Sequence, residues 1–172
     1  MVNLISEKIL QLVEASAGEI MKKWIEGLYT DPMTASFLDE NTGFVENKAR
    51  FMLKNMIYWI SNDISKEELG IICFNEGREM FGRGIPLCEV TRALNAGRRT
   101  LLQYTENGII IESALQIHQM REFDKRVTLF FDRAQYYMIR GYIEEMRSRA
   151  SSLNVLMRDN SDEVFFDDSF YN

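Results

Sequence analysis

A glycine-rich junction constrains the fold of this chain more than any other segment. It reads EGREMFGRGIPL over residues 76–87. The helical pattern before it ends at Gly82 and Gly84, because glycine readily adopts the conformations that end a helix. Pro86 suits the first turn of a following helix, where its missing N–H costs nothing. The junction therefore predicts two consecutive helices joined by a tight turn.

Apolar residues recur at helical spacing through most of the remaining chain. Capping residues and breakers then set the approximate limits of five long helices. The predicted helices cover residues 6–30, 43–62, 65–82, 86–108 and 120–141. The third of these begins with a capping box, in which a serine and a glutamate three positions later satisfy free amides.

Composition supports a helical fold with one core. The 172 residues are 46% hydrophobic and include only two prolines and ten glycines, which leaves little room for an architecture with many turns. A chain of this length buries one sizeable core. The sequence predicts an all-α, single-domain bundle of about six or seven helices over residues 1–150.

Residues 151–172 differ in character from the rest of the chain. Five acidic residues and no basic one fall within residues 159–172, and removing them leaves 21 acidic against 20 basic residues, a net charge of −1. Aromatic residues alternate with these acids in the sequence FFDDSFY. Such a tail is typical of a flexible segment, although aromatic residues also anchor interfaces well. We therefore expect a flexible or partner-docking tail.

Charge and hydropathy argue against nucleic acid and membranes as partners. The acidic chain opposes binding to phosphates. No run approaches the roughly 20 apolar residues that cross a bilayer, and the amino terminus has no pattern of a signal peptide. The expected compartment is the cytoplasm, where Cys73 and Cys88 would be buried thiols rather than a disulfide.

The residues that usually carry catalysis are scarce. His118 is the sole histidine, which excludes di-iron bundles and ordinary multi-histidine zinc sites. The glycines of the junction follow a helix rather than a strand and lack the lysine of a phosphate-binding loop. Glu76 and Glu79 lie near arginines and are interpreted as surface ion pairs. The sequence predicts a protein that is not an enzyme and has no metal site.

The last predicted helix carries an apolar stripe with alternating steps of three and four. It includes Phe123, Val127, Phe130 and Tyr137. About two and a half heptads do not prove a coiled coil. Two interpretations stay open: a stripe that faces the core of the bundle, and a dimer interface that makes this helix the output element.

The junction also resembles a known family. Gly77-Arg78, then GIPLxxVxxAL over residues 84–94, followed by Arg98-Arg99, resembles the amino-terminal domain of the RsbR-type co-antagonists of the RsbT kinase, in particular the RsbRD branch. The resemblance covers residues 6–148. It implies an all-helical input domain of bacterial stress signalling that has no catalytic activity, acts through protein contacts and is often a dimer. The family's usual STAS or kinase module does not follow residue 150 in this sequence, so we expect either a free-standing version of the domain or a fragment.

The same segment is similar to the proximal region of globin-coupled sensors. Such sensors place a histidine four residues before the glycine of the turn, and the residue at that position here is Met80. A thioether is not the usual proximal ligand of a sensing haem. The resemblance therefore implies a globin-like fold without haem, with a pocket that is packed by Met and Phe side chains or open to an apolar ligand.

These observations lead to one expected function and two alternatives. The first is a non-catalytic signalling domain, without cofactors, that forms a homodimer, contacts a protein partner and senses a small apolar ligand. Its expected pocket residues are Phe74, Met80, Phe81 and Leu87. The alternatives are a globin-like sensor that binds haem or another cofactor, and an adaptor that binds a partner through its C-terminal tail.

Overall fold

A computed structural model shows an all-α bundle, as the sequence predicts. It describes residues 7–61 and 64–165, and the side chains of these residues as far as 153. In chain order, the elements are α1 (Glu7–Ala15), α2 (Ala17–Thr30), the 3-10 helix η1 (Pro32–Phe37), α3 (Thr42–Ser61), α4 (Lys66–Gly82), α5 (Leu87–Gly108) and α6 (Ala114–Phe165). No strand occurs in these ranges. The predicted all-α single-domain bundle of six or seven helices is therefore confirmed.

Local sequence signals explain both ends of α4. Ser65 Oγ accepts a hydrogen bond from the Glu68 amide at 3.1 Å, and Glu68 Oε2 accepts one from the Ser65 amide at 2.8 Å, which completes the predicted capping box. The helix ends at Gly82, and Gly84 has a φ of 75°, a value that favours glycine. Pro86 is the residue directly before α5. The junction thus forms the tight turn that its glycines predict.

Two of the predicted helices differ from the observed ones. The helix expected over residues 6–30 is broken at Ser16 into α1 and α2. The last helix begins at Ala114 rather than near Met120 and continues to Phe165 instead of ending near Gly141. Its start is capped by Ser113, whose hydroxyl accepts from the Gln116 amide at 3.3 Å. No break marks the predicted domain boundary at residue 150, and residues 166–172 of the tail lie outside the described part.

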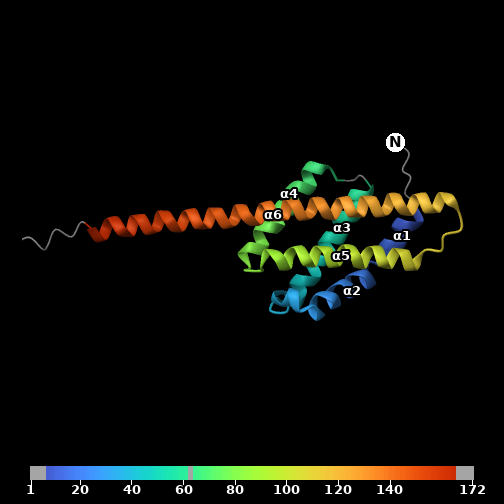
Figure 1. The fold of residues 1–172 in the computed structure, drawn as a ribbon, viewed down its shortest axis with the longest axis horizontal. Helices are drawn as coiled ribbons and strands as arrows, with labels where there is room; N and C mark the ends of the chain where they lie inside the picture. The colour runs from blue at the N-terminus through green and yellow to red at the C-terminus, as the bar shows by residue number, and fades with distance from the viewer. Residues whose placement is uncertain (1–6, 62–63, 166–172) are drawn as a thin grey trace, which may run out of the picture.

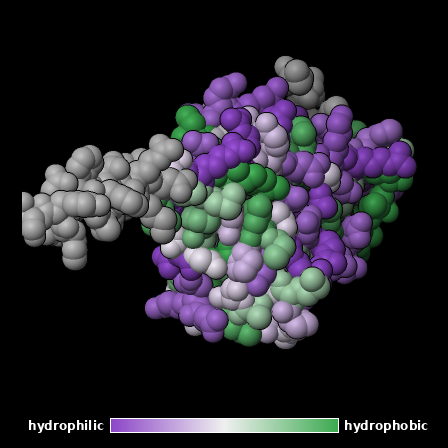
Figure 2. Space-filling model, turned by 60° about the vertical axis from the view of Figure 1, so that its left-hand side comes forward, coloured by the Kyte–Doolittle hydropathy of each residue, from purple (hydrophilic) through white to green (hydrophobic). Residues whose placement is uncertain are grey.

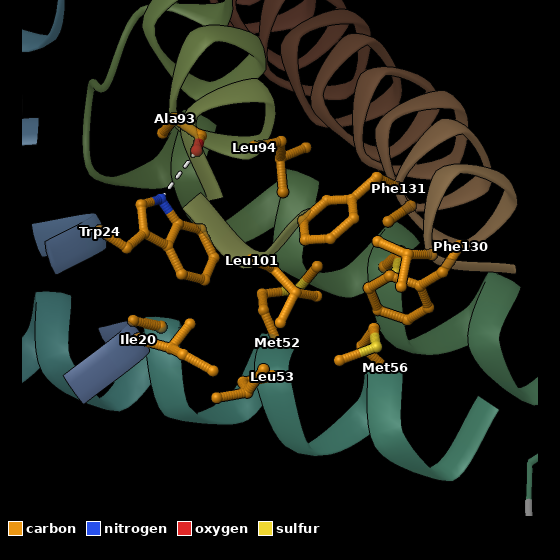
Figure 3. Packing of buried hydrophobic residues seen from close by; sticks show 14 of the residues in the cluster. Ile20, Trp24, Met52, Leu53, Met56, Ala93, Leu94, Leu101, Phe130 and Phe131 are labelled. Carbon is orange, nitrogen blue, oxygen red and sulfur yellow. Dashed lines mark hydrogen bonds between the residues drawn. The ribbon is translucent and has the colours of Figure 1, made fainter. Parts of the chain in front are cut away.

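α6 organises the arrangement of the bundle. Figure 1 shows α5 and α6 running side by side, α4 crossing α6, and the second half of α6 projecting beyond the other helices. Figure 3 shows that the side chains of the core come from α2, α3, α5 and α6. The core is rich in aromatic and methionine side chains, including Trp24, Met52, Met56, Phe123 and Phe130.

The outer surface is mixed in polarity. Figure 2 shows one face, on which hydrophobic residues form separate areas among hydrophilic ones. None of the helices in the described ranges is long and apolar enough to span a membrane.

Candidate functional site

A small apolar cavity lies inside the bundle, where five helices and η1 meet. Its volume is about 40 Å³. One water molecule needs roughly 10–15 Å³ on this scale, so the space suits a few waters or one small apolar group. Most of the wall is apolar and the charged groups are confined to Lys48 and Glu76. The lining residues are Trp24, Leu28, Phe37, Val45, Lys48, Ala49, Met52, Glu76, Met80, Val90, Ala93, Leu94 and Met138.

Trp24 fixes one wall of the cavity. Its indole Nε1 donates a 2.9 Å hydrogen bond to the carbonyl oxygen of Ala93 (Figure 3). The ring also packs on Gly97, where any Cβ would overlap the indole. A buried indole N–H needs such a partner, so α2 is held against α5 in one orientation.

A buried ion cluster forms the polar end of the cavity. Lys48 Nζ of α3 lies 2.7 Å from Glu76 Oε2 and 2.5 Å from Glu79 Oε2, both on α4. Glu76 is only 9% exposed, and Lys48 is the cation that its Oε2 contacts. Arg83 extends the cluster by pairing with Glu79 at 3.2 Å and with Glu40 at 3.0 Å.

The surroundings shift the pKa values of this cluster in different directions. Burial raises the pKa of Glu76, and the neighbouring Lys48 only partly opposes this effect. Burial alone would lower the pKa of Lys48, but its two carboxylate partners raise it. The pKa of Glu79 is also pushed up by burial, yet Lys48 and Arg83 bring it below its ordinary value. Glu76 is therefore the member whose ionised form is least favoured.

Glycines allow α4 and α6 to touch along their backbones beside the cavity. A Cβ at Gly77 would overlap the carbonyl oxygen of Met138, and a Cβ at Gly141 would overlap that of Phe74. The ring of Tyr137 covers Gly70, where a Cβ would come within 3.0 Å of it. Such close packing leaves little freedom for one helix to move without the other.

The predicted pocket residues are only partly at this cavity. Met80 lines it, whereas Phe74, Phe81 and Leu87 do not. The ring of Phe81 instead packs edge-on against Tyr142 of α6, with the ring centroids 5.1 Å apart. Only one of the four predicted pocket residues therefore lines the cavity. Most of the other lining residues come from α2, α3 and α5.

The predicted dimer residues mostly face the core of their own chain. Phe123, Val127 and Phe130 are all 0% exposed. Tyr137 is half-buried and covers α4. The core-facing interpretation of this stripe therefore fits the structure, and these four residues are not an exposed interface.

Other candidate groups lie away from the cavity. His118 is exposed near the start of α6. Cys73 is buried as predicted, but Cys88 is exposed, contrary to expectation, and both thiols are free. Within the described ranges, no group of three His, Cys, Asp or Glu side chains is placed to hold a metal ion.

Glu76 is the site residue that the sequence interpretation misplaces. It is buried and paired with Lys48, not a surface partner of an arginine; Arg78 pairs instead with Glu145 of α6 at 2.9 Å. A signal exists in the sequence, because Glu76 interrupts the apolar face formed by Leu69, Cys73 and Met80. Its partner Lys48 carries no such signal.

The size of the cavity bears on the haem alternative. A haem macrocycle does not fit into about 40 Å³ unless the surrounding helices move apart. Met80 does line the space, as the resemblance to globin-coupled sensors suggests, but Glu76 and Lys48 also line it. The residues present do not fit a haem in this arrangement.

Comparisons with known proteins give no further guide to function. No family model, no curated protein and no solved structure matches the chain.

Proposed function

We propose that this chain is a non-catalytic signalling input domain of the bacterial cytoplasm. It takes up a small apolar ligand, without haem, in the cavity between α2, α3, α4, α5 and α6. Occupation of the cavity changes the packing of α4 on α6, and a protein partner responds to the change. The sequence resemblance to RsbRD-type input domains supports the same role.

The position of Met138 carries this proposal. Met138 lines the cavity, and its backbone carbonyl oxygen lies where a Cβ at Gly77 of α4 would be. A ligand that displaces Met138 must therefore act at a place where the two helices are in backbone contact. In this proposal α4 and α6 pack in two ways, one with the cavity empty and one with it filled. A ligand shifts the equilibrium between them only by the difference in its affinity for the two arrangements. An apolar wall with limited free volume provides that difference.

The wall chemistry sets the class of ligand. Aliphatic, aromatic and thioether groups dominate the lining, and the charges of Lys48 and Glu76 largely neutralise each other. A ligand of a few heavy atoms with an apolar body fits this environment. A larger one would have to separate α3 from α4 and break the Lys48 ion pairs.

Xenon is a suitable probe of this cavity because it binds dry apolar cavities. Trp24 lines the cavity and Trp59 does not, so Trp59→Phe leaves one reporting indole. We expect saturable quenching of Trp24 fluorescence by xenon. Ala49→Leu, which places bulk into the cavity, should abolish the quenching, whereas Ala15→Leu on the exposed surface should not. Quenching that does not saturate, or that survives Ala49→Leu, would refute ligand uptake at this site.

A further inference from the structure

Exposed aliphatic side chains gather where α5 is joined to α6. This junction lies at the end of the bundle opposite to the projecting half of α6 (Figure 1). Single exposed apolar residues are normal on a protein surface, whereas a group of them is typical of an interaction site. The exposed side chains are Ile110 (81%), Ile111 (49%), Leu115 (60%) and Ile117 (41%).

A groove lies beside these residues, formed by the end of α5, the connecting loop and the first turns of α6. Its volume is about 340 Å³, near the lower limit of about 300 Å³ for pockets that hold small molecules. A long side chain of a partner therefore suits it better than a large molecule. Its wall is mostly apolar, and its lining residues are Glu106, Ile109, Ile111, Ile117, Met120, Arg121 and Asp124.

Asp124 is a polar group of this groove that lacks a partner. Its Oδ1 is buried and accepts no hydrogen bond from the residues that the structure describes. Burial and the charge of Glu106 raise the pKa of its carboxyl, and no cation in the described ranges opposes them. Arg121 lines the same groove one turn earlier on α6 but forms no ion pair with Asp124. A buried oxygen without a partner costs free energy, which a bound cation recovers.

We infer that this groove binds a basic side chain, lysine or arginine, that lies between aliphatic residues of a partner protein. Such a side chain has an apolar stem and a charged head. Its stem packs on Ile111 and Ile117 while its head pairs with Asp124, and Ile110 and Leu115 contact the neighbouring aliphatic residues of the partner. The inference rests on the proposed function, because it gives the chemistry of the partner that the proposal requires.

Charge favours this partner over a second copy of the chain or a membrane. Glu106 and Asp124 line the groove and Glu112 lies in the adjoining loop, whereas Arg121 is the basic residue of the lining. Two copies that met at this surface would bring these carboxylates together, and an anionic membrane would repel them. Because α6 carries both this groove and Met138 at the cavity, the partner contacts the helix that responds to the ligand.

The amine n-butylamine is a suitable probe, because it matches the side chain of lysine. Its binding is followed by the methyl resonances of Ile109, Ile111 and Ile117, which line the groove. We expect saturable shifts and an affinity about tenfold higher than that of n-butanol, since a hydrogen bond to a charged group is worth this much. Asp124→Asn should remove this preference. Glu46→Gln, a control at an exposed carboxylate of α3, should keep it.

Selection from a library of random displayed peptides tests whether the occupant is a protein segment. We expect the wild type to enrich peptides in which a lysine or arginine lies next to leucine, isoleucine, valine or phenylalanine. Asp124→Asn should lose this enrichment. Ile110→Ser/Leu115→Ser removes exposed side chains outside the groove, so it should weaken peptide binding without changing the affinity for n-butylamine. Circular dichroism checks that each variant keeps its helices.

Several results would overturn the inference. Equal binding of n-butylamine and n-butanol, or a preference that survives Asp124→Asn, would show that the groove does not select a cation. Binding of n-butylamine without enrichment of basic peptides would show a site for free amines instead of a partner. A dimer of the wild type that Ile110→Ser/Leu115→Ser dissociates would show a second copy as the occupant. If these tests fail while xenon still quenches Trp24, this inference alone is overturned and the proposed ligand uptake stands.

Discussion

Gly141 of α6 lies so close to Phe74 of α4 that a Cβ at position 141 would overlap the Phe74 carbonyl oxygen. The reciprocal contact, Gly77 against Met138, lies next to the internal cavity. The two contacts bring the backbones of α4 and α6 together at their crossing. Met138 belongs to this crossing and also lines the cavity, so a group that fills the cavity contacts the crossing.

Gly141→Ala should destabilise the protein. The added methyl group forces the α4 and α6 backbones apart, and overpacking of this kind costs about 1–3 kcal/mol. Gly27→Ala is the control, because Gly27 is an exposed helical glycine around which an added Cβ would meet nothing within 4 Å; it should stabilise the protein by about 0.5–1 kcal/mol. Urea unfolding measures both changes. Equal effects of the two substitutions would contradict the close crossing.

Met80→Ala should lower stability by enlarging the cavity. Truncation of a buried methionine costs about 2–5 kcal/mol, depending on how far the surroundings collapse. Met33 is 62% exposed, so Met33→Ala should change stability by less than about 0.5 kcal/mol. If thermal unfolding shows the same loss for both variants, Met80 does not line a packed cavity.

Lys48→Met should destabilise the protein in a pH-dependent way. The change leaves Glu76 buried without its cation, and breaking a buried ion pair in this way costs about 3–5 kcal/mol at pH 7. Burial raises the pKa of Glu76, so its protonated form is favoured in the folded state. The penalty is therefore present at high pH and falls as pH decreases through the raised pKa towards the ordinary value of 4.5.

Replacing both partners is the control for this ion pair. Lys48→Met/Glu76→Met removes the unpaired charge and should recover most of the stability at pH 7, because a well-packed apolar pair often replaces a buried ion pair without loss. Denaturant unfolding at pH 5 and pH 7 measures the effect. A Lys48→Met penalty that is the same at both pH values would show that Glu76 is not its source.

The two cysteines should differ in reactivity. Burial, and to a lesser degree the charge of Glu76, raises the pKa of Cys73 to about 12. Cys88 is exposed. A thiol reagent at pH 8 should therefore modify one thiol per folded chain and both thiols in denaturant, because only the thiolate reacts. Rapid modification of both thiols in the native protein would contradict the burial of Cys73.

Local sequence signals predict most of the fold. The Ser65 capping box, the end of α4 at Gly82 and the end of α5 at Gly108 each depend on chemistry within a few residues. The break at Ser16 has no strong local signal, since the flanking residues are compatible with helix. Gly141 resembles a helix end in the sequence, but it is a glycine that α4 requires for close approach.

The candidate site can be predicted only in part. Met80 is identified from its place in the junction, whereas Trp24, Ala93 and Met138 become neighbours only through tertiary packing. The apolar stripe through Phe123 is recognised correctly, and the structure shows that it faces the core of its own chain. Single-sequence periodicity locates an apolar face without saying what covers it.

Hydrogen exchange of α6 under xenon tests the coupling between cavity and output helix most directly. We predict that amide exchange around residues 138–141 changes with the same half-saturation as the quenching of Trp24, and that Ala49→Leu abolishes both responses. Saturable quenching of Trp24 with unchanged exchange in α6 would contradict the account, because the cavity would then bind a ligand without moving the helix that carries the signal.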